Sequence, residues 1–152
     1  MPVQELAGEE LAERLSLALS GIVERHDAAA VWVVPSRIDE AAAFLKDDPD
    51  LDFQFLNSIS AVDYVEYFDL VYHLTSFRRQ RCAIFKARVF GREDLQVPSV
   101  YHLWRGADYQ EREIWDLMGV RFLDHPNLKR LMLWESFPGH PLRKDFEDTV
   151  QY

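Results

Sequence analysis

The decapeptide RCAIFKARVF at residues 81–90 alternates between apolar side chains and side chains of mixed character. The apolar set is Ala83, Phe85, Ala87 and Val89, and the alternate set is Cys82, Ile84, Lys86 and Arg88. Because successive side chains of a strand point to opposite faces, this period of two predicts a strand with one face on a hydrophobic core. The preceding residues 77–80 (FRRQ) are expected to form a turn.

Two strand segments with the same period are expected before that turn. Their apolar positions are Phe53 and Phe55 in the first, and Phe68, Leu70, Tyr72 and Leu74 in the second. A shorter buried strand is expected over residues 30–34, where Pro35 ends it. The sequence therefore predicts a sheet of about four strands.

Helical patterns flank the strands on both sides. Apolar residues at helical spacing behind an acidic first turn predict a helix over about residues 8–25. Ser36 precedes Asp39 by three residues and is expected to cap a second helix that continues through Leu45. Pro98 suits the first turn of a short helix ending near Trp104. A fourth helix is expected from Asp108 to Met118, with Gly119 as its left-handed C-cap.

The predicted fold class is α+β. Residues 1–120 are expected to form one domain, in which a mixed, mostly antiparallel sheet packs with helices. Residues 121–152 are expected to form an extended C-terminal arm, because prolines at 126, 138 and 141 force their predecessors toward extended geometry. A chain of 152 residues is long enough for one hydrophobic core.

Composition and charge restrict the class of protein and its partners. Apolar residues make up 48% of the chain and charged residues 28%, which is typical of a globular protein and excludes intrinsic disorder. The longest apolar run, residues 28–34, is far shorter than the roughly 20 residues that span a bilayer. The acidic N-terminus does not resemble a targeting signal, so the default compartment is the cytoplasm. A net charge of −9 argues against a nucleic-acid partner.

The basic residues are concentrated in one stretch. Residues 76–100 carry six basic and two acidic side chains, whereas residues 1–75 carry four basic and fifteen acidic ones. Phenylalanines lie between these cations, as in proteins that bind oligonucleotides. Alternation along a strand sends neighbouring cations to opposite faces. We therefore expect the cations to pair with the acidic N-terminal half or with a partner.

Residue patterns for common cofactors and catalytic sites are absent from the sequence. The single cysteine, Cys82, excludes an internal disulfide and a four-cysteine iron–sulfur cluster. The six glycines do not form a nucleotide-binding GxGxxG turn, and the five histidines do not form an HExxH zinc motif. We expect no bound cofactor and no metal site in this chain.

Several carboxylates lie on the helix before Gly119. Glu111, Glu113 and Asp116 are close enough in sequence to share general acid and base work. The favoured interpretation is a structural or docking role. Side chains four residues apart can contact each other along one face of a helix, as in the pairs Arg112–Asp116 and Glu111–Trp115. The opposite side of this helix carries Ile114, Leu117 and Met118 and is expected to be buried.

The C-terminal arm mixes large apolar side chains with charges. Such a strip either lies over the chain's own sheet or forms an interface with a partner, and composition does not decide between them. Arg143 has a planar fork that suits bidentate pairing with a carboxylate. We hypothesise that Phe137, Leu142 and Phe146 bury against a partner while Arg143 pairs with an acidic group there.

Four blocks of sequence carry a family resemblance: residues 111–122 (EREIWDLMGVRF), 125–126 (HP), 128–130 (LKR) and 139–146 (GHPLRKDF). They resemble the C subunit of NADH-quinone oxidoreductase, which belongs to the peripheral arm of respiratory complex I, and a looser similarity extends back to about Asn57. Asp124 stands where the family usually has glycine, which brings the local turn into question because aspartate adopts left-handed geometry less freely.

The resemblance implies a subunit without a redox centre. It implies that the chain docks on the hydrogenase-like D subunit, which helps to form the quinone site, within a complex that passes electrons from NADH to quinone and pumps protons. FMN, iron–sulfur clusters and quinone would belong to partner subunits. The chain would lie peripherally on the cytoplasmic face of the cell membrane and reach the membrane only through the complex. The implied docking residues are Glu111, Arg112, Glu113, Asp116, His125, Pro126, Arg130, His140, Pro141, Arg143, Lys144 and Asp145.

Two alternatives remain open. Within the family, the same fold serves ferredoxin-, F420H2- or formate-linked complexes and membrane-bound hydrogenases, so the electron donor is undetermined. In a different class, the chain would be a free-standing hydrolase that uses Glu111, Glu113 or His140.

Overall fold

The structure is a computed structural model that describes residues 3–148. The α-helices are α1 (Gly8–Ala18), α2 (Ile38–Asp47) and α3 (Ala107–Met118), and residues Pro35–Arg37 form a single 3-10 turn. The strands are β1 (Gln4–Glu5), β2 (Val23–His26), β3 (Ala30–Val33), β4 (Phe55–Asp63), β5 (Tyr67–Ser76), β6 (Arg81–Phe90), β7 (Gln96–Pro98) and β8 (Arg121–Leu123).

The main sheet has six strands in the order β2-β3-β6-β5-β4, with β1 beside β6. Strand β6 is antiparallel to β5 and parallel to β3 and β1, and the β2–β3 and β4–β5 pairs are antiparallel. The predicted α+β class with a mixed, mostly antiparallel sheet is confirmed. The sheet has more strands than the four expected, because β1 and β2 are short, exposed strands without an apolar period of two.

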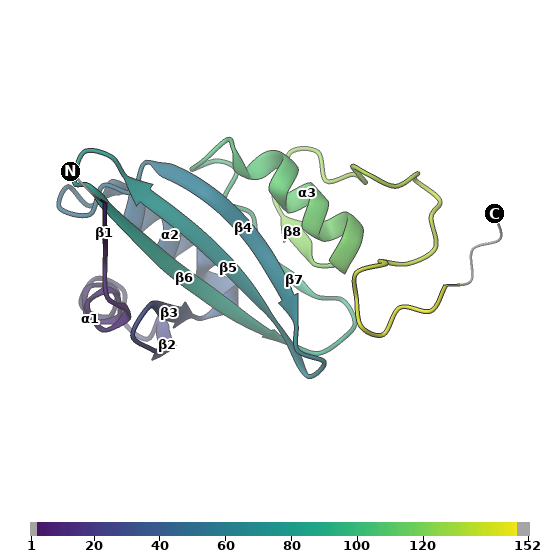
Figure 1. Cartoon of the computed structure of the whole chain (residues 1–152), viewed down its shortest axis with the longest axis horizontal. Helices are drawn as coiled ribbons and strands as arrows, with labels where there is room; N and C mark the ends of the chain where they lie inside the picture. The colour runs from purple at the N-terminus through teal and green to yellow at the C-terminus, as the bar shows by residue number, and fades with distance from the viewer. Residues whose placement is uncertain (1–2, 149–152) are drawn as a thin grey trace.

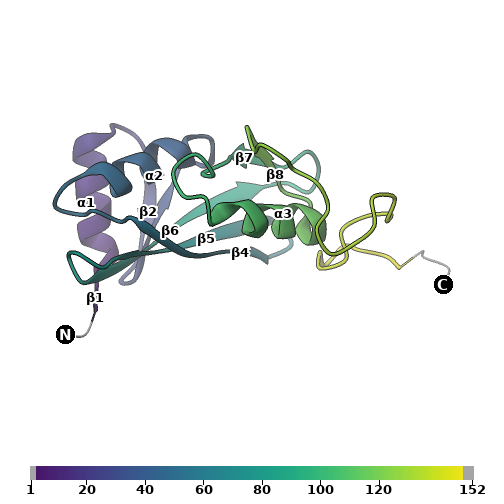
Figure 2. The ribbon, with the colours of Figure 1, turned by 90° about the horizontal axis from the view of Figure 1, so that it is seen from above.

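The helices lie on one side of the sheet (Figures 1 and 2). The predicted inner face of β6 is buried, and the ring of Phe85 stacks on that of Tyr72 from β5 at a centroid distance of 4.5 Å. Apolar side chains of α1 and α2, such as Leu15 and Leu45, join the same core. Strands β4 to β6 turn their other face toward the viewer in Figure 1.

Two helix predictions in the N-terminal half need correction. Helix α1 ends at Ala18 instead of near residue 25, because the chain turns at Gly21, which has a φ of 74°, and enters β2. Ser36 does not cap α2: it lies inside the 3-10 turn, and no side chain caps the helix at Arg37. Pro35 favours this tight turn at the end of β3.

The segment around Pro98 is a strand and a turn rather than a short helix. Residues Gln96–Pro98 form β7, which pairs in parallel with β8. The N–H of Trp104 donates to the carbonyl of Val100 and closes the following turn. The local sequence gives no sign of β7, since its pairing strand follows α3.

The predicted fourth helix and its C-cap are confirmed. Helix α3 ends at Met118, and Gly119 adopts a left-handed φ of 77°. Asp124, the residue that departs from the family pattern, has a φ of 66° and so adopts the left-handed geometry that glycine favours.

Gly8 provides a test of how closely α1 packs on the β2–β3 turn. A β-carbon on Gly8 would lie 2.1 Å from the carbonyl oxygen of Asp27 and 2.4 Å from that of Ala30. We expect Gly8→Ala to lower the free energy of unfolding by about 1–3 kcal/mol in chemical denaturation, because backbone must shift. Gly106→Ala is the matched control, since no atom lies within 4 Å of its β-carbon position. Equal stabilities of the two variants would contradict the close packing.

Candidate functional site in the C-terminal arm

The C-terminal arm begins in β8 and continues beside the end of α3 (Figure 1). Residues 124–148 contain no helix or strand. Such a segment lacks the repeating hydrogen bonds that hold regular elements in place, so its conformation depends on individual contacts. Two buried carboxylates, Asp116 and Asp63, supply five of its hydrogen bonds.

Asp116 lies in the last turn of α3 and is fully buried. Its Oδ2 accepts hydrogen bonds from the N–H groups of Leu131, Met132 and Leu133 at 3.1, 2.8 and 3.1 Å. Its Oδ1 accepts one from Nη1 of Arg130 at 2.8 Å. Burial alone would raise the pKa of this carboxyl group, but the donors, led by Arg130, lower it overall. Asp116 is therefore ionised and holds residues 130–133 against α3.

Two arginines bind the backbone of the arm. Nη2 of Arg130 donates to the carbonyl oxygens of Phe137 and Gly139, each at 2.8 Å. Arg112, from α3, donates to the carbonyls of Lys129 and Arg130 at 3.2 and 3.1 Å. Both guanidinium groups satisfy carbonyls that have no partner in a helix or strand, which fixes the path of the arm over residues 129–139.

His140 closes the first half of the arm against α3. Its Nδ1 donates to the backbone carbonyl of Asp116 at 2.9 Å, and its ring packs against Trp115 at a centroid distance of 5.0 Å. Burial, together with the charges of Arg130 and Arg143, lowers the pKa of His140. The ring is therefore a neutral donor at pH 7. The N–H of Leu142 then donates to the carbonyl of Leu117.

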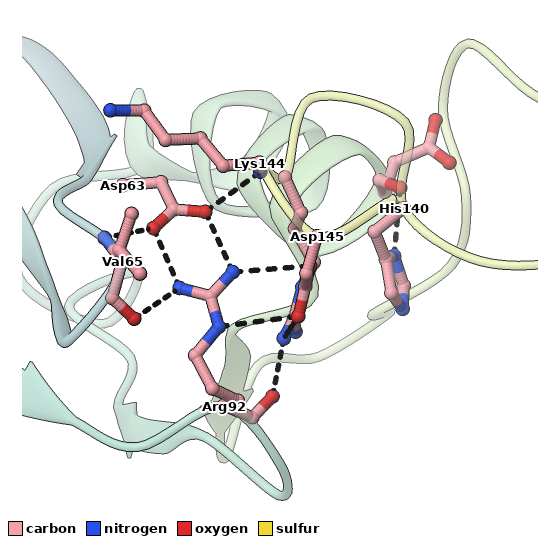
Figure 3. A network of polar contacts seen from close by, with 8 residues as sticks. Asp63, Val65, Arg92, His140, Lys144 and Asp145 are labelled. Atoms are coloured by element: carbon pink, nitrogen blue, oxygen red, sulfur yellow. Dashed lines mark hydrogen bonds and ion pairs between the residues drawn. The ribbon is translucent and has the colours of Figure 1, made fainter. Parts of the chain in front are cut away.

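Asp63, at the end of β4, anchors the second half of the arm (Figure 3). Its oxygens accept from Nη1 and Nη2 of Arg92 at 2.6 and 2.8 Å, and from the N–H groups of Val65 and Lys144 at 2.8 and 2.9 Å. The Arg92 guanidinium holds the pKa of Asp63 well below its usual range. The N–H of Lys144 thereby attaches the arm to the main sheet.

Arg92 also links the arm through a second carboxylate. Its Nη2 lies 3.1 Å from Oδ1 of Asp145, and Nε of Arg143 donates to the same oxygen at 2.9 Å. Arg143 thus has a carboxylate partner within its own chain. The two arginines lower the pKa of Asp145, with Arg143 the larger cause.

Glu111 and His125 fix the start of α3 and of the arm. Glu111 is fully buried and accepts hydrogen bonds from the Ser99 hydroxyl and from the N–H of Val100. Burial raises the pKa of Glu111 to about 7. His125 Nδ1 accepts from the N–H of Asn127, and its Nε2 donates to the backbone carbonyl of Asp108 at 3.2 Å.

The anchored arm presents apolar side chains to solvent. Met132, Trp134 and Leu142 are 64, 52 and 61% exposed, whereas Phe137 is buried between the rings of Trp134 and Phe146. Within residues 3–148, no helix is long and apolar enough to cross a membrane. The same residues contain no group of three His, Cys, Asp or Glu side chains arranged to hold a metal ion.

Residues 31–151 match the family described as the respiratory-chain NADH dehydrogenase 30 kDa subunit. The chain belongs to this family. The C subunit of NADH-quinone oxidoreductase from Roseiflexus sp. (strain RS-1) is 42% identical over 90% of this chain and 80% of that protein. The C subunit of the same enzyme from Chelativorans sp. (strain BNC1) is 37% identical over 97% of this chain and 74% of that protein.

The fold also matches a chain in the structure of the membrane-bound sulfane sulfur reductase, an archaeal respiratory membrane complex. The TM-score is 0.72 over 93% of this chain and 86% of that chain, with 22% sequence identity. At that identity the match concerns the fold alone. The matched chain of that complex therefore shares this arrangement of sheet and helices.

Residues 111–113 do not form the contacts expected from the sequence. The predicted side-chain pairs along one face of the helix are wrong, because Glu111 and Asp116 are buried and Arg112 binds carbonyls of the arm. Glu113 is exposed, and so is Pro126. The prediction that the basic stretch pairs with the acidic N-terminal half is confirmed by Arg88 with Asp69 and Arg92 with Asp63.

Sequence reasoning missed Asp63 and Arg92 as functional candidates. In the sequence, Asp63 follows a predicted strand segment and Arg92 is one of six cations in the basic stretch, so neither stands out as a functional residue. Their link to Lys144 spans 81 residues of sequence, so no local pattern marks it.

We expect Asp116→Asn to loosen the first half of the arm. The amide would replace one acceptor oxygen with a donor among the N–H groups of residues 131–133. Loss of hydrogen bonds to a charged group should raise the amide exchange rates of these residues roughly ten- to a hundredfold. Glu113→Gln is the control, because it removes the same charge from an exposed position on α3. Unchanged exchange in Asp116→Asn would show that Asp116 does not anchor the arm.

Glu111 should make stability depend on pH. Its pKa is about 7 in the folded chain and near 4.3 when unfolded, so the unfolded state loses this proton first as the pH rises. Stability should be full below about pH 4 and fall by about 2–3 kcal/mol between about pH 4 and pH 7. We expect Glu111→Gln, compared with wild type in urea unfolding at pH 5 and pH 8, to gain relative stability at pH 8. Glu113→Gln should show no such change, and a parallel response of the two variants would exclude Glu111 as the cause.

Proposed function

We propose that this chain is a cofactor-free, non-catalytic peripheral-arm subunit of a proton-pumping NADH:quinone oxidoreductase. It docks on the hydrogenase-like D subunit, called the quinone-site subunit below, and residues 121–152 act as the docking arm of the domain formed by residues 1–120. The observation that supports this most directly is the combination of a fixed backbone with exposed Met132, Trp134 and Leu142. A preordered apolar surface loses little conformational entropy on binding.

The chemistry of the anchors favours docking over catalysis. Asp63 and Asp116 each accept four hydrogen bonds and are buried. A general base must lie within reach of a substrate proton. Burial keeps both carboxylates from a substrate, and we assign FMN, iron–sulfur clusters and quinone to partner subunits.

The hydrolase alternative has little geometric support. Glu111 faces Ser99 inside the chain, and Glu113 is exposed two residues further along α3. Side chains two residues apart on a helix do not face each other, so these carboxylates do not converge on one substrate. His140 directs its Nδ1 to the carbonyl of Asp116.

The choice of NADH as electron donor follows from the relatives rather than from this chain's residues. Equivalent subunits of ferredoxin-, F420H2- or formate-linked complexes, or of membrane-bound hydrogenases, are the alternative within the family. In every case the chain is peripheral to the membrane, on its cytoplasmic face, and attached through the complex.

The docking role of the arm can be tested by co-purification of the tagged chain from gently solubilised membranes of the native host. We expect wild type to recover a homologue of the quinone-site subunit together with flavin and iron–sulfur subunits. The variant Met132→Ser/Leu142→Ser should recover at least tenfold less, because both exposed side chains lose their apolar contact area. Truncation after Trp134 should have the same effect.

The control is Leu17→Ser, which removes an 82% exposed leucine from α1 and should leave recovery unchanged. Full recovery of the quinone-site subunit by both arm variants would show that the arm is dispensable. Recovery of wild type alone, from the soluble fraction, would instead support a free-standing protein.

A further inference from the structure

The helices lie on one side of the main sheet and leave its other face uncovered (Figure 2). We call this uncovered face of strands β2 to β6 the open face. On β6 the side chains of the open face are Cys82, Ile84, Lys86 and Arg88, the set opposite the core. This surface contains none of the arm residues considered above. It is therefore a separate surface from the arm that we propose to dock on the quinone-site subunit.

A cluster of cations lies on the open face around one indole ring. Trp32 of β3 is in register with Arg25 of β2 on one side and with Lys86 of β6 on the other. The charged ends of Lys86, Arg25 and Arg88 lie 4.7, 5.1 and 5.5 Å from the ring centre. These side chains cover the indole, which is only 6% exposed. Three positive charges thus meet at one point of a chain whose net charge is −9.

Carboxylates within the chain satisfy only part of this cluster. Arg88 forms a bidentate pair with Asp69, at 2.9 and 3.1 Å, and Asp69 also accepts from Nε1 of Trp32 at 3.4 Å. Among the ion pairs formed by residues 3–148, none includes Arg25 or Lys86. The nearby Asp27 carboxylate accepts hydrogen bonds from the N–H groups of residues 29 and 30, and these lower its pKa. The charges of Lys86 and Arg25 add smaller contributions to the same shift, without an ion-pair contact.

A pocket of about 540 Å³ lies on the same face, next to this cluster. Its apolar lining includes Val3, Ala29, Phe77 and Ile84, and polar groups of Asn57, His73 and Glu5 lie at its wall. Glu5 is in register with Cys82, four residues before Lys86 on β6. Ile84 and Lys86 are two residues apart on one strand, so about 7 Å separates the pocket wall from the cation. The open face therefore places an apolar cavity beside cations that lack an ion-pair partner in the described chain.

We propose that the open face is a second docking surface, which binds an acidic segment of a partner polypeptide. Carboxylates of that segment pair with Arg25 and Lys86, and a neighbouring apolar side chain of the segment enters the pocket beside Ile84. An extended segment with these groups two residues apart matches the spacing on β6. This proposal is independent of the arm and of the donor used by the complex.

The same cluster suits an acidic peptide better than a nucleic acid. Single-stranded nucleic acids bind by stacking bases on exposed aromatic rings. The indole of Trp32 is covered by cations and offers no free face for stacking. The overall negative charge also opposes a polyphosphate backbone, whereas a short acidic segment engages only the local field.

The test is carbodiimide cross-linking of the purified complex, followed by mass spectrometry. This reagent joins a lysine amine to a carboxylate only when the two are already in contact. We expect Lys86 to be joined to an aspartate or glutamate of another subunit. Lys86→Arg should abolish that cross-link without loss of the partner, because arginine keeps the charge and does not form the amide. Lys46, on α2, is the matched control and should not join the same acidic peptide.

Charge reversal tests the energetic contribution. Arg25→Glu/Lys86→Glu should reduce recovery of the cross-linked partner at least tenfold, while Lys46→Glu should not. Circular dichroism of each variant checks that the sheet is intact. If the double variant misfolds, the single variant Arg25→Glu, at an exposed edge position, replaces it in the same measurement.

Three outcomes would overturn the proposal. The first is cross-linking of Lys86 only within its own chain, or not at all, in a complex that retains every subunit. The second is joining of Lys86 to a second copy of this chain. The third is release of bound nucleic acid, rather than of a polypeptide, on charge reversal.

Discussion

The buried carboxylates of Asp63 and Asp116 determine the conformation of the C-terminal arm. A buried ionised carboxylate is stable only when donors surround it, and the arm supplies the N–H groups of residues 131–133 and 144. Asp116 also lies at the negative end of the α3 dipole, where a carboxylate is unfavourable without compensation. Arg130 provides that compensation for Asp116, and Arg92 pairs with Asp63. The irregular arm is therefore held by charge-assisted hydrogen bonds to two regular elements.

Local sequence patterns are sufficient to predict the helices and strands in which apolar residues recur at a regular spacing. Strand β6 and helix α3 were predicted because their apolar spacing and the glycine at 119 act within a dozen residues. Strand β2 was mistaken for helix, since Ile22 continues the apolar spacing of α1 and only the turn at Gly21 interrupts it. Strand β7 was missed because its pairing depends on β8, on the far side of α3.

The site was predictable in its residue types but not in its contacts. The resemblance pointed to Asp116, Arg130, Arg143 and Asp145, yet their partners became visible only in three dimensions. Arg143 was expected to seek a partner's carboxylate, and Asp145 supplies one two residues away in its own chain. Asp63 contacts Lys144 across 81 positions. Contacts at that separation are set by the sheet, which no short motif encodes.

The two candidate surfaces use different physical interactions. On the arm, Arg130, Arg143 and Asp145 form ion pairs within the chain, so the proposed docking relies mainly on burial of the exposed Met132, Trp134 and Leu142. On the open face, Arg25 and Lys86 retain their charge toward solvent, and electrostatic attraction there weakens as salt screens it. A single small domain can thus contact two partners without competition, because one surface follows the end of α3 and the other lies across the sheet. Under both proposals, the chain would contribute to its complex by positioning neighbouring subunits.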